Sequence, residues 1–250
     1  MIEARGLYKR YGDLLAVSDV SFTVGRGEVV GFLGPNGAGK TTIMRILTGF
    51  LPASDGTAIL AGHDIFDEPL AARRAVGYLP ETPPLYLEMD VVSYLRFVAR
   101  LKDVPRARVK DAVERAVERC GLASVHRRVI GTLSKGFRQR VGLAQAIVHE
   151  PPVLILDEPT VGLDPIQIRE IRDLIAELAS GAEEERQTVV LSTHILPEVE
   201  AICRRVILIN GGRKVLDGSL AELTQGGQRL EEVFARVTLA ADQEPGGAAA

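Results

Sequence analysis

The sequence has few of the features of a protein that is stabilised by disulfide bonds or bound metal ions, or of one that spans a membrane. Its 250 residues include only two cysteines and no tryptophan. Cys120 and Cys203 are far apart and lack Cys-x-x-Cys or Cys/His spacing, so we expect reduced interior thiols of a cytosolic protein. Met1–Arg5 runs straight into strand-like sequence, and no apolar run approaches the roughly 20 residues that span a bilayer. If the protein acts at a membrane, we therefore expect it to act through a partner.

The chain also lacks an excess of basic residues. Its formal net charge is −3, with 46% hydrophobic and 25% charged residues. This is an ordinary globular composition, so we expect most of the chain to fold around a sizeable core. Nucleic-acid platforms usually carry a basic excess, and the charge therefore argues against a nucleic-acid partner.

Strand and helix patterns alternate along most of the chain. Short apolar or alternating runs predict strands at 2–4, 20–24, 28–33, 57–60, 75–79, 153–156, 188–192 and 205–209. Helical spacing predicts helices at 41–47, 91–101, 106–120, 135–149, 166–179 and 197–203, with Gly121 ending the third. Strands alternating with helices imply a mostly parallel sheet covered by helices. Residues 82–150 interrupt the alternation as a helical insertion, and we expect the Gly/Ala-rich tail 242–250 to be disordered.

A glycine-rich segment follows the strand predicted at 28–33 and precedes the helix predicted at 41–47. It reads Gly34-Pro35-Asn36-Gly37-Ala38-Gly39-Lys40-Thr41. Glycines let backbone N–H groups approach phosphates, the lysine can reach the β- and γ-oxygens, and the threonine hydroxyl can ligate Mg²⁺. Glycine-rich turns are common, but the flanking strand and helix favour a phosphate-binding loop over a plain turn. The segment predicts binding of a nucleoside triphosphate.

Three further polar residues follow predicted strands. Asp157 and Glu158 end the strand at 153–156, at the edge where open α/β sheets place their ligands. There Asp157 would hold Mg²⁺, and Glu158 would orient or deprotonate the attacking water. The alternative, a pair that merely begins a turn, ranks second because of the phosphate loop. His194 follows the strand at 188–192 and could hold the water, although a lone histidine there is more often structural.

The order of these motifs along the chain is similar to that of a known protein family. Leu133-Ser134-Lys135-Gly136-Phe137 precedes the Asp-Glu strand, and Gly162-Leu163-Asp164 and His194 follow it. With the phosphate loop, this order resembles ATP-binding cassette (ABC) ATPase subunits over about residues 2–220. The resemblance implies an α/β fold: a P-loop NTPase core with a mostly parallel sheet, a small N-terminal antiparallel β subdomain and an inserted α-helical subdomain. The core would comprise 1–81 and 151–220, the helical subdomain 82–150, and a C-terminal helix and tail 221–250.

The resemblance also assigns roles at a shared site. Ser134 and the backbone of Gly136 would start a helix that faces the ATP of a second subunit. Two subunits would then close head to tail around two ATP molecules, with Asp164 at the seam. Thr42 would join the phosphate contacts. Tyr11 matches the aromatic residue that stacks on adenine, and the alternative is an exposed turn tyrosine.

Two positions depart from the family pattern. Glu81 stands where a glutamine usually reaches Mg²⁺ and water; a carboxylate can still bind Mg²⁺ but adds negative charge beside the γ-phosphate. Lys135-Gly136-Phe137 replaces a Gly-Gly-Gln core, although Ser134 and Gly136 remain. Both departures are similar to the type-2 exporter branch, and within it to gliding-motility and nitrous-oxide-reductase-maturation ATPases.

The type-2 exporter resemblance implies a membrane partner and a docking surface for it. In such systems a separate permease docks a coupling helix beside residues 81–95. Tyr86 and Tyr94 would line that groove, or belong to the core of the helical lobe.

The predicted function is therefore an ATP-hydrolysing subunit that powers export, using ATP and Mg²⁺. It would lie on the cytoplasmic face of the membrane with a permease and a second nucleotide-binding subunit, and one complete motif set is compatible with a homodimer. The alternative is a soluble ABC ATPase of a non-transport machine. Repair members carry a long coiled-coil insertion and translation factors carry two cassettes, whereas this chain shows neither. A non-catalytic scaffold would be expected to lack Lys40 or Glu158.

Overall fold

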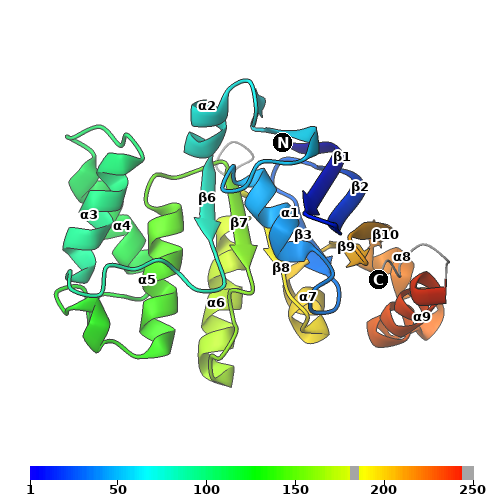
Figure 1. Cartoon of the computed structure of the whole chain (residues 1–250). Helices are drawn as coiled ribbons and strands as arrows, with labels where there is room; N and C mark the ends of the chain where they lie inside the picture. The colour runs from blue at the N-terminus through cyan, green and yellow to red at the C-terminus, as the bar shows by residue number, and fades with distance from the viewer. Residues whose placement is uncertain (181–185, 244–250) are drawn as a thin grey trace.

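The computed structural model describes residues 1–180 and 186–243, which form two sheets, an inserted helical lobe and a C-terminal helix (Figure 1). The larger sheet has the strand order β10-β9-β3-β8-β7-β6, and only β10 runs antiparallel to its neighbour. Its strands are β3 (Val29–Leu33), β6 (Val76–Leu79), β7 (Val153–Asp157), β8 (Thr188–Ser192), β9 (Arg205–Asn210) and β10 (Arg213–Ser219). Every residue of β3, β7 and β8 is buried, as expected for parallel strands covered on both faces.

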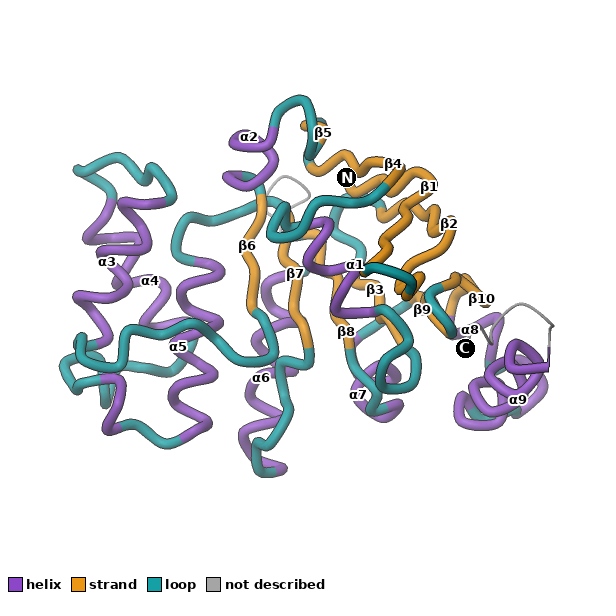
Figure 2. The backbone as a smooth tube through the Cα atoms, in the orientation of Figure 1, coloured by secondary structure: helices purple, strands orange, loops and turns teal. Residues whose placement is uncertain are grey.

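The smaller sheet is antiparallel, in the order β2-β1-β4-β5, and lies beside the larger one (Figure 2). It contains β1 (Ile2–Tyr11), β2 (Leu14–Val24), β4 (Asp55–Leu60) and β5 (His63–Asp64). Helix α1 (Lys40–Leu47) packs between the two sheets, and its Ile43 and Met44 are fully buried there. On the other face of the larger sheet lie α6 (Pro165–Leu178) and α7 (Leu196–Ile202). The mostly parallel sheet and the antiparallel N-terminal sheet are confirmed.

The helical insertion lies between β6 and β7 and consists of α3 (Val91–Leu101), α4 (Val109–Arg119), α5 (Lys135–Ile147) and the 3₁₀ turn Ile130–Thr132. The Asp90 side chain caps α3 by accepting a hydrogen bond from the Ser93 N–H. The helix predicted from Arg106 begins only at Val109, because the Arg108 N–H first closes a turn on the Pro105 carbonyl. Its end is as predicted: Gly121, with φ +63°, follows the last turn.

Four elements were not predicted, and one prediction for the tail is wrong. The unpredicted elements are β5, β10, α2 (Pro69–Arg74) and α8 (Leu220–Leu223). A short 3₁₀ turn, Gln225–Gly227, then leads to α9 (Leu230–Gln243), which lies against β9 and β10 and buries Leu230 in the core. Asp242 and Gln243 belong to α9, so the predicted disordered tail does not begin at 242. Residues 244–250 lie outside the described part of the chain.

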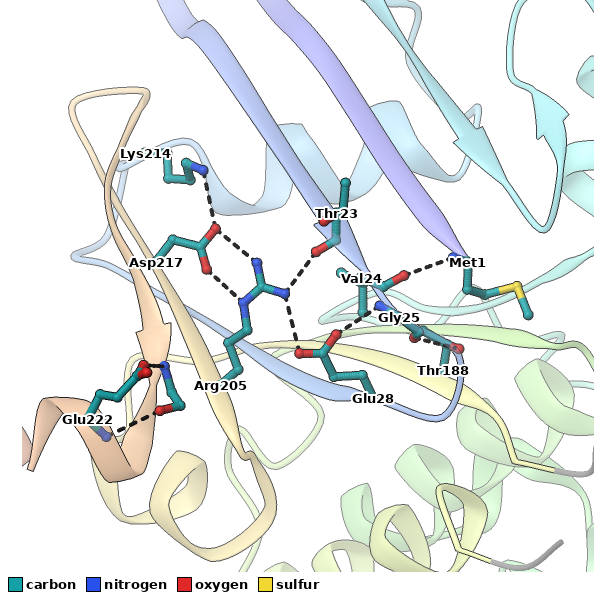
Figure 3. Close-up of polar contacts among 11 residues, drawn as sticks. Met1, Thr23, Val24, Gly25, Glu28, Thr188, Arg205, Lys214, Asp217 and Glu222 are labelled. Atoms are coloured by element: carbon teal, nitrogen blue, oxygen red, sulfur yellow. Dashed lines mark hydrogen bonds and ion pairs between the residues drawn. The ribbon is translucent and has the colours of Figure 1, made fainter. Parts of the chain in front are cut away.

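The guanidinium of Arg205 joins the two sheets (Figure 3). Its Nε and Nη2 donate to both carboxylate oxygens of Asp217 on β10, at 2.7 and 3.0 Å. Its Nη1 donates to the Thr23 carbonyl of β2 at 3.0 Å and to Glu28, before β3, at 3.3 Å. Such charge-assisted bonds are stronger than neutral ones. Arg205 therefore ties β2 of the antiparallel sheet to β9 and β10 of the larger sheet, at the end where β3 begins.

The two cysteines lie in the interior of the fold, as predicted. Cys120 follows α4 and Cys203 follows α7; both are free and buried. Burial raises the pKa of each thiol to about 12, so neither forms the reactive thiolate at neutral pH.

Candidate ATP-binding site

The phosphate loop occupies the connection from β3 to α1, as the sequence predicts. Gly34 adopts φ +155°, and a Cβ atom at this position would lie 2.1 Å from the Ile209 carbonyl oxygen of β9. Only glycine fits so close to a neighbouring strand. The loop is therefore pressed against β9 and turns directly into α1, so that Lys40 is the first residue of the helix.

Lys40 is buried within this loop. Its Nζ donates to the Gly34 carbonyl at 2.7 Å and to the Pro35 carbonyl at 3.0 Å. Burial lowers the pKa of Lys40, and the negative charges of Glu158 and Asp157 act in the opposite direction. The ammonium group thus lies inside the loop and close to both carboxylates, in a position to exchange a carbonyl oxygen for a phosphate oxygen.

Asp157, at the end of β7, lies against the first turn of α1. The Thr41 hydroxyl donates to its Oδ1 at 3.2 Å, and the Ser192 hydroxyl of β8 donates to the same atom. The other oxygen, Oδ2, is buried and has no hydrogen-bond partner. A buried carboxylate oxygen needs a donor or a cation. Together with the Thr41 hydroxyl, this oxygen fits the hard oxygen set that Mg²⁺ prefers when phosphates supply further ligands.

Glu158 and His194 face each other from the ends of β7 and β8. The Nδ1 atom of His194 lies 3.0 Å from each carboxylate oxygen of Glu158. The Glu158 side chain is 9% exposed and that of His194 is 47% exposed, so the histidine lies on the solvent side. Glu158 also has φ +49°, a conformation that costs free energy in a non-glycine residue and concentrates at functional sites. Glu158 can act as a base toward a water molecule bound beside the pair, with His194 as its hydrogen-bonding partner.

The segment around Ser134 lies on the helical lobe, away from this cluster. The exposed Ser134 is the N-cap of α5 and accepts a hydrogen bond from the Phe137 N–H at 3.4 Å. Gly136 is buried, and the end of the Gln167 side chain of α6 lies 2.4 Å from where its Cβ atom would be, so a larger residue there would displace that side chain. Within residues 1–180 and 186–243, neither residue has a hydrogen bond to the phosphate loop, to Asp157 or to Glu158.

Two other predicted site residues are also apart from the cluster. Tyr11 ends β1 and is 44% exposed, and the ammonium of Lys9 lies 5.3 Å from its ring centroid. Its stacking on adenine stays a prediction. Glu81 follows β6 and is exposed, and no hydrogen bond or ion pair joins its carboxylate to another described residue. Its role in binding a metal ion also stays a prediction.

Sequence reasoning missed four polar residues behind the cluster. Ser192 donates to Asp157, and Thr160 and Thr193 both donate to the buried carboxylate of Glu198. Ser192 and Thr193 stand next to His194, so their place at a strand end was a usable signal. For Thr160 and Glu198 the sequence offers no such signal, because their contact joins residues 38 positions apart.

The fold and the cluster define a P-loop ATPase: a lysine in a glycine loop, a hydroxyl and an aspartate fit for a cation, and a glutamate–histidine pair.

Comparisons with known proteins agree with this class and identify a narrower family within it. The family profile described as "ABC transporter" matches residues 17–161. The chain is 37% identical to the ABC transporter ATP-binding protein NatA of Bacillus subtilis (strain 168), over 87% of each chain. It is 34% identical to the lantibiotic transport ATP-binding protein SrtF of Streptococcus pyogenes, over 94% of this chain and 96% of that one.

Among solved structures, an ATP-binding subunit of an ABC transporter superposes with a TM-score of 0.85 at 30% identity, covering 95% of this chain and 99% of the other. The chain belongs to the ABC transporter family. It is an ATP-binding subunit that hydrolyses ATP and works with a separate membrane permease. None of these similarities supports the alternative of a cassette for a non-transport machine. In the described residues, no helix is long and apolar enough to cross a membrane.

Proposed function

We propose that two copies of this chain close head to tail around two Mg²⁺-ATP complexes and so drive export through a permease at the cytoplasmic face of the membrane. One observation carries this proposal: the site within one chain is incomplete. Lys40, Thr41, Asp157, Glu158 and His194 are brought together, whereas Ser134 is exposed at the start of α5 on another lobe. An exposed helix start with free N–H groups attracts phosphate, and a second copy can supply it.

Mg²⁺ would be held by the free Oδ2 of Asp157 and the Thr41 hydroxyl, with further oxygens from the phosphates and water. When bound, it would neutralise charge that develops on the phosphates. Lys40 would bind the β- and γ-oxygens, Glu158 would accept the proton of the attacking water, and His194 would orient that water. Export as the direction of transport follows relatives named for lantibiotic transport and Nod factor export. The narrower similarity to gliding-motility and nitrous-oxide-reductase-maturation ATPases stays a prediction.

The base assignment is tested by Glu158→Gln. This variant keeps the shape of the side chain and removes the proton acceptor, so we expect ATP binding to survive and kcat to fall by about a hundredfold or more. ATP should then accumulate the closed pair of subunits, seen as a dimer in gel filtration. A variant that hydrolyses ATP as fast as the parent chain would show that Glu158 is not the base.

The docking surface for the permease lies between the helical lobe and the core. A cavity of about 330 Å³ there is lined by residues that include Arg45, Phe50, Tyr78 and Lys102. Beside it, the ring of Tyr86 packs on Phe97 of α3 with centroids 5.4 Å apart, and both remain partly exposed. Tyr94, by contrast, is buried in the lobe, so for this residue the core alternative is correct. Exposed aromatic rings beside a cavity are a typical anchor site for a partner segment.

Docking is tested with tagged protein recovered from detergent-solubilised host membranes. We expect one polytopic membrane protein to co-purify with the parent chain, and mass spectrometry identifies it. The pair Tyr86→Asp and Phe97→Asp should lose that protein while retaining ATP binding, because two charges would have to be buried at the contact. Leu239→Asp on α9 is the matched control, since Leu239 is also exposed but distant in the fold. Recovery of soluble companions alone would favour a non-transport machine.

A further inference from the structure

Glu198 is a buried carboxylate that the phosphate chemistry does not use. It lies in α7 and is only 1% exposed. Across residues 1–180 and 186–243, no lysine, arginine or histidine forms an ion pair with it. Burying a carboxylate away from water is costly unless its oxygens are hydrogen-bonded. A buried acid without a cation therefore needs strong and specific donors.

Two threonine hydroxyls supply these donors. Thr160 Oγ1 donates to Oε1 of Glu198 at 2.5 Å, and Thr193 Oγ1 donates to Oε2 at 3.1 Å. Both threonines are themselves buried. Thr193 Oγ1 in turn accepts a hydrogen bond from the Ile195 N–H at 3.1 Å, which fixes the backbone on the far side of His194. The carboxylate thus bridges two segments with one oxygen for each.

These two segments carry the catalytic pair. The parallel pairing of β7 and β8 ends at Asp157 and Ser192, and its last backbone bond runs from the Glu158 N–H to the Ser192 carbonyl at 3.0 Å. Among the described residues, no backbone hydrogen bond joins the two segments beyond that one. Glu158 is two residues before Thr160, and His194 is the residue after Thr193. Their side chains meet at 3.0 Å just past the end of the ladder. The Glu198 carboxylate joins the two segments at the place where the backbone ladder stops doing so.

We propose that Glu198 is a positioning residue for ATP hydrolysis: through Thr160 and Thr193 it fixes the distance between Glu158 and His194. It touches neither ATP nor the attacking water. Its loss leaves Lys40 and the phosphate loop intact, because within the described residues neither the Glu198 carboxylate nor the two threonine hydroxyls forms a hydrogen bond to them. Loss of Glu198 therefore slows the chemical step of ATP hydrolysis and leaves the affinity for ATP unchanged.

The test compares Glu198→Ala with Glu198→Gln and with Glu200→Ala, which removes an exposed carboxylate from the same helix. For each full-length protein, kcat and KM for ATP, the Kd of a fluorescent ATP analogue and the melting temperature are measured. We expect Glu198→Ala to lower kcat by tenfold to about a hundredfold with Kd within about twofold, since misplacement by about 1 Å has that effect. Glu198→Gln should stay within about threefold of the parent kcat, because an amide can still accept from one threonine and donate to the other. Glu200→Ala should match the parent chain.

Two results would overturn the proposal. The first is a folded Glu198→Ala protein whose kcat stays within about twofold of the parent value. The second is a loss of kcat that only follows a parallel loss of ATP binding or of folded protein, which would make the role structural. If Glu198→Ala does not fold, Thr160→Val removes one donor to the carboxylate, and Thr193→Val removes the other donor together with the acceptor of the Ile195 N–H. A lowered kcat at unchanged Kd then supports the proposal, and an unchanged kcat in both variants contradicts it.

Discussion

At the scale of single residues, the phosphate loop depends on the close approach of Gly34 to β9. A Cβ atom at Gly34 would lie 2.1 Å from the Ile209 carbonyl, whereas one at Gly37, with φ +80°, would meet nothing within 4 Å. We expect Gly34→Ala to lower the free energy of unfolding by at least about 3 kcal/mol, because the strand or the loop must move. Gly37→Ala is the matched control and should cost about 1–2 kcal/mol, from backbone strain alone. Urea denaturation without nucleotide measures both, and equal losses would contradict the packing argument.

Among single residues, the sequence identifies those site residues that belong to a motif or whose hydrogen-bond partners are near in the chain. Lys40, Thr41, Asp157, Glu158 and His194 follow strands or begin a helix, and the carboxyl ends of parallel strands meet at one edge. The bridge from Glu198 to Thr160 and Thr193 could not be predicted in this way. It depends on how α7 is set against the ends of β7 and β8, which only the packed structure provides.

At the scale of elements, His149 lies at the contact between the end of α5 and β6. Its Nε2 lies 3.2 Å from the Val76 carbonyl, and burial, together with the charge of Lys102, lowers its pKa to about 4. An unfolded histidine has a pKa near 6.5 and binds the proton more readily. His149 therefore makes its full contribution to the free energy of unfolding above about pH 6.5, and this contribution is lost as the pH falls toward 4.

The size of this effect can be measured by urea denaturation at pH 7.5 and pH 5.0. We expect His149 to account for a loss of about 2 kcal/mol in the free energy of unfolding between the two pH values. His149→Phe should remove that part of the pH dependence, whatever it does to stability at pH 7.5. His126→Gln, at a half-buried histidine outside this contact, is the control variant. An unchanged slope in His149→Phe would mean that the ring is already solvated.

The elements that the sequence predicts well are those with a strong period or a fully buried run. Helix α3 and strand β8 have the predicted bounds, because each carries an unbroken apolar pattern. Helix α2 has only one buried residue, Ala72, and so has no periodicity to detect. Strand β10 lies at a sheet edge and alternates poorly, although the Gly211-Gly212 turn before it is a hairpin signal.

At the scale of the whole molecule, the two halves of the proposed composite site lie on different lobes of one chain. The resemblance of motif order predicts this division, but periodicity alone does not. In the structure the lobes are tied together near Ser134. The Gln139 side chain donates to the Pro159 carbonyl at 3.0 Å, and Arg140 forms an ion pair with Glu170 of α6. These contacts hold the start of α5 to the segment after Glu158 and to α6, next to the exposed Ser134.

A mixture of two inactive variants can decide whether the site is shared between copies. Ser134→Arg should block the phosphate site offered to a partner while the chain binds its own ATP, and Glu158→Gln should bind ATP without hydrolysis. Each protein alone should have about a hundredth of the parent kcat or less. In a mixed head-to-tail dimer, one site combines the intact Glu158 of one chain with the intact Ser134 of the other, so activity should return. Because about half of randomly paired dimers are mixed and each has one working site, we expect roughly a quarter of the parent rate. If each chain instead completed its own site, mixing would restore nothing.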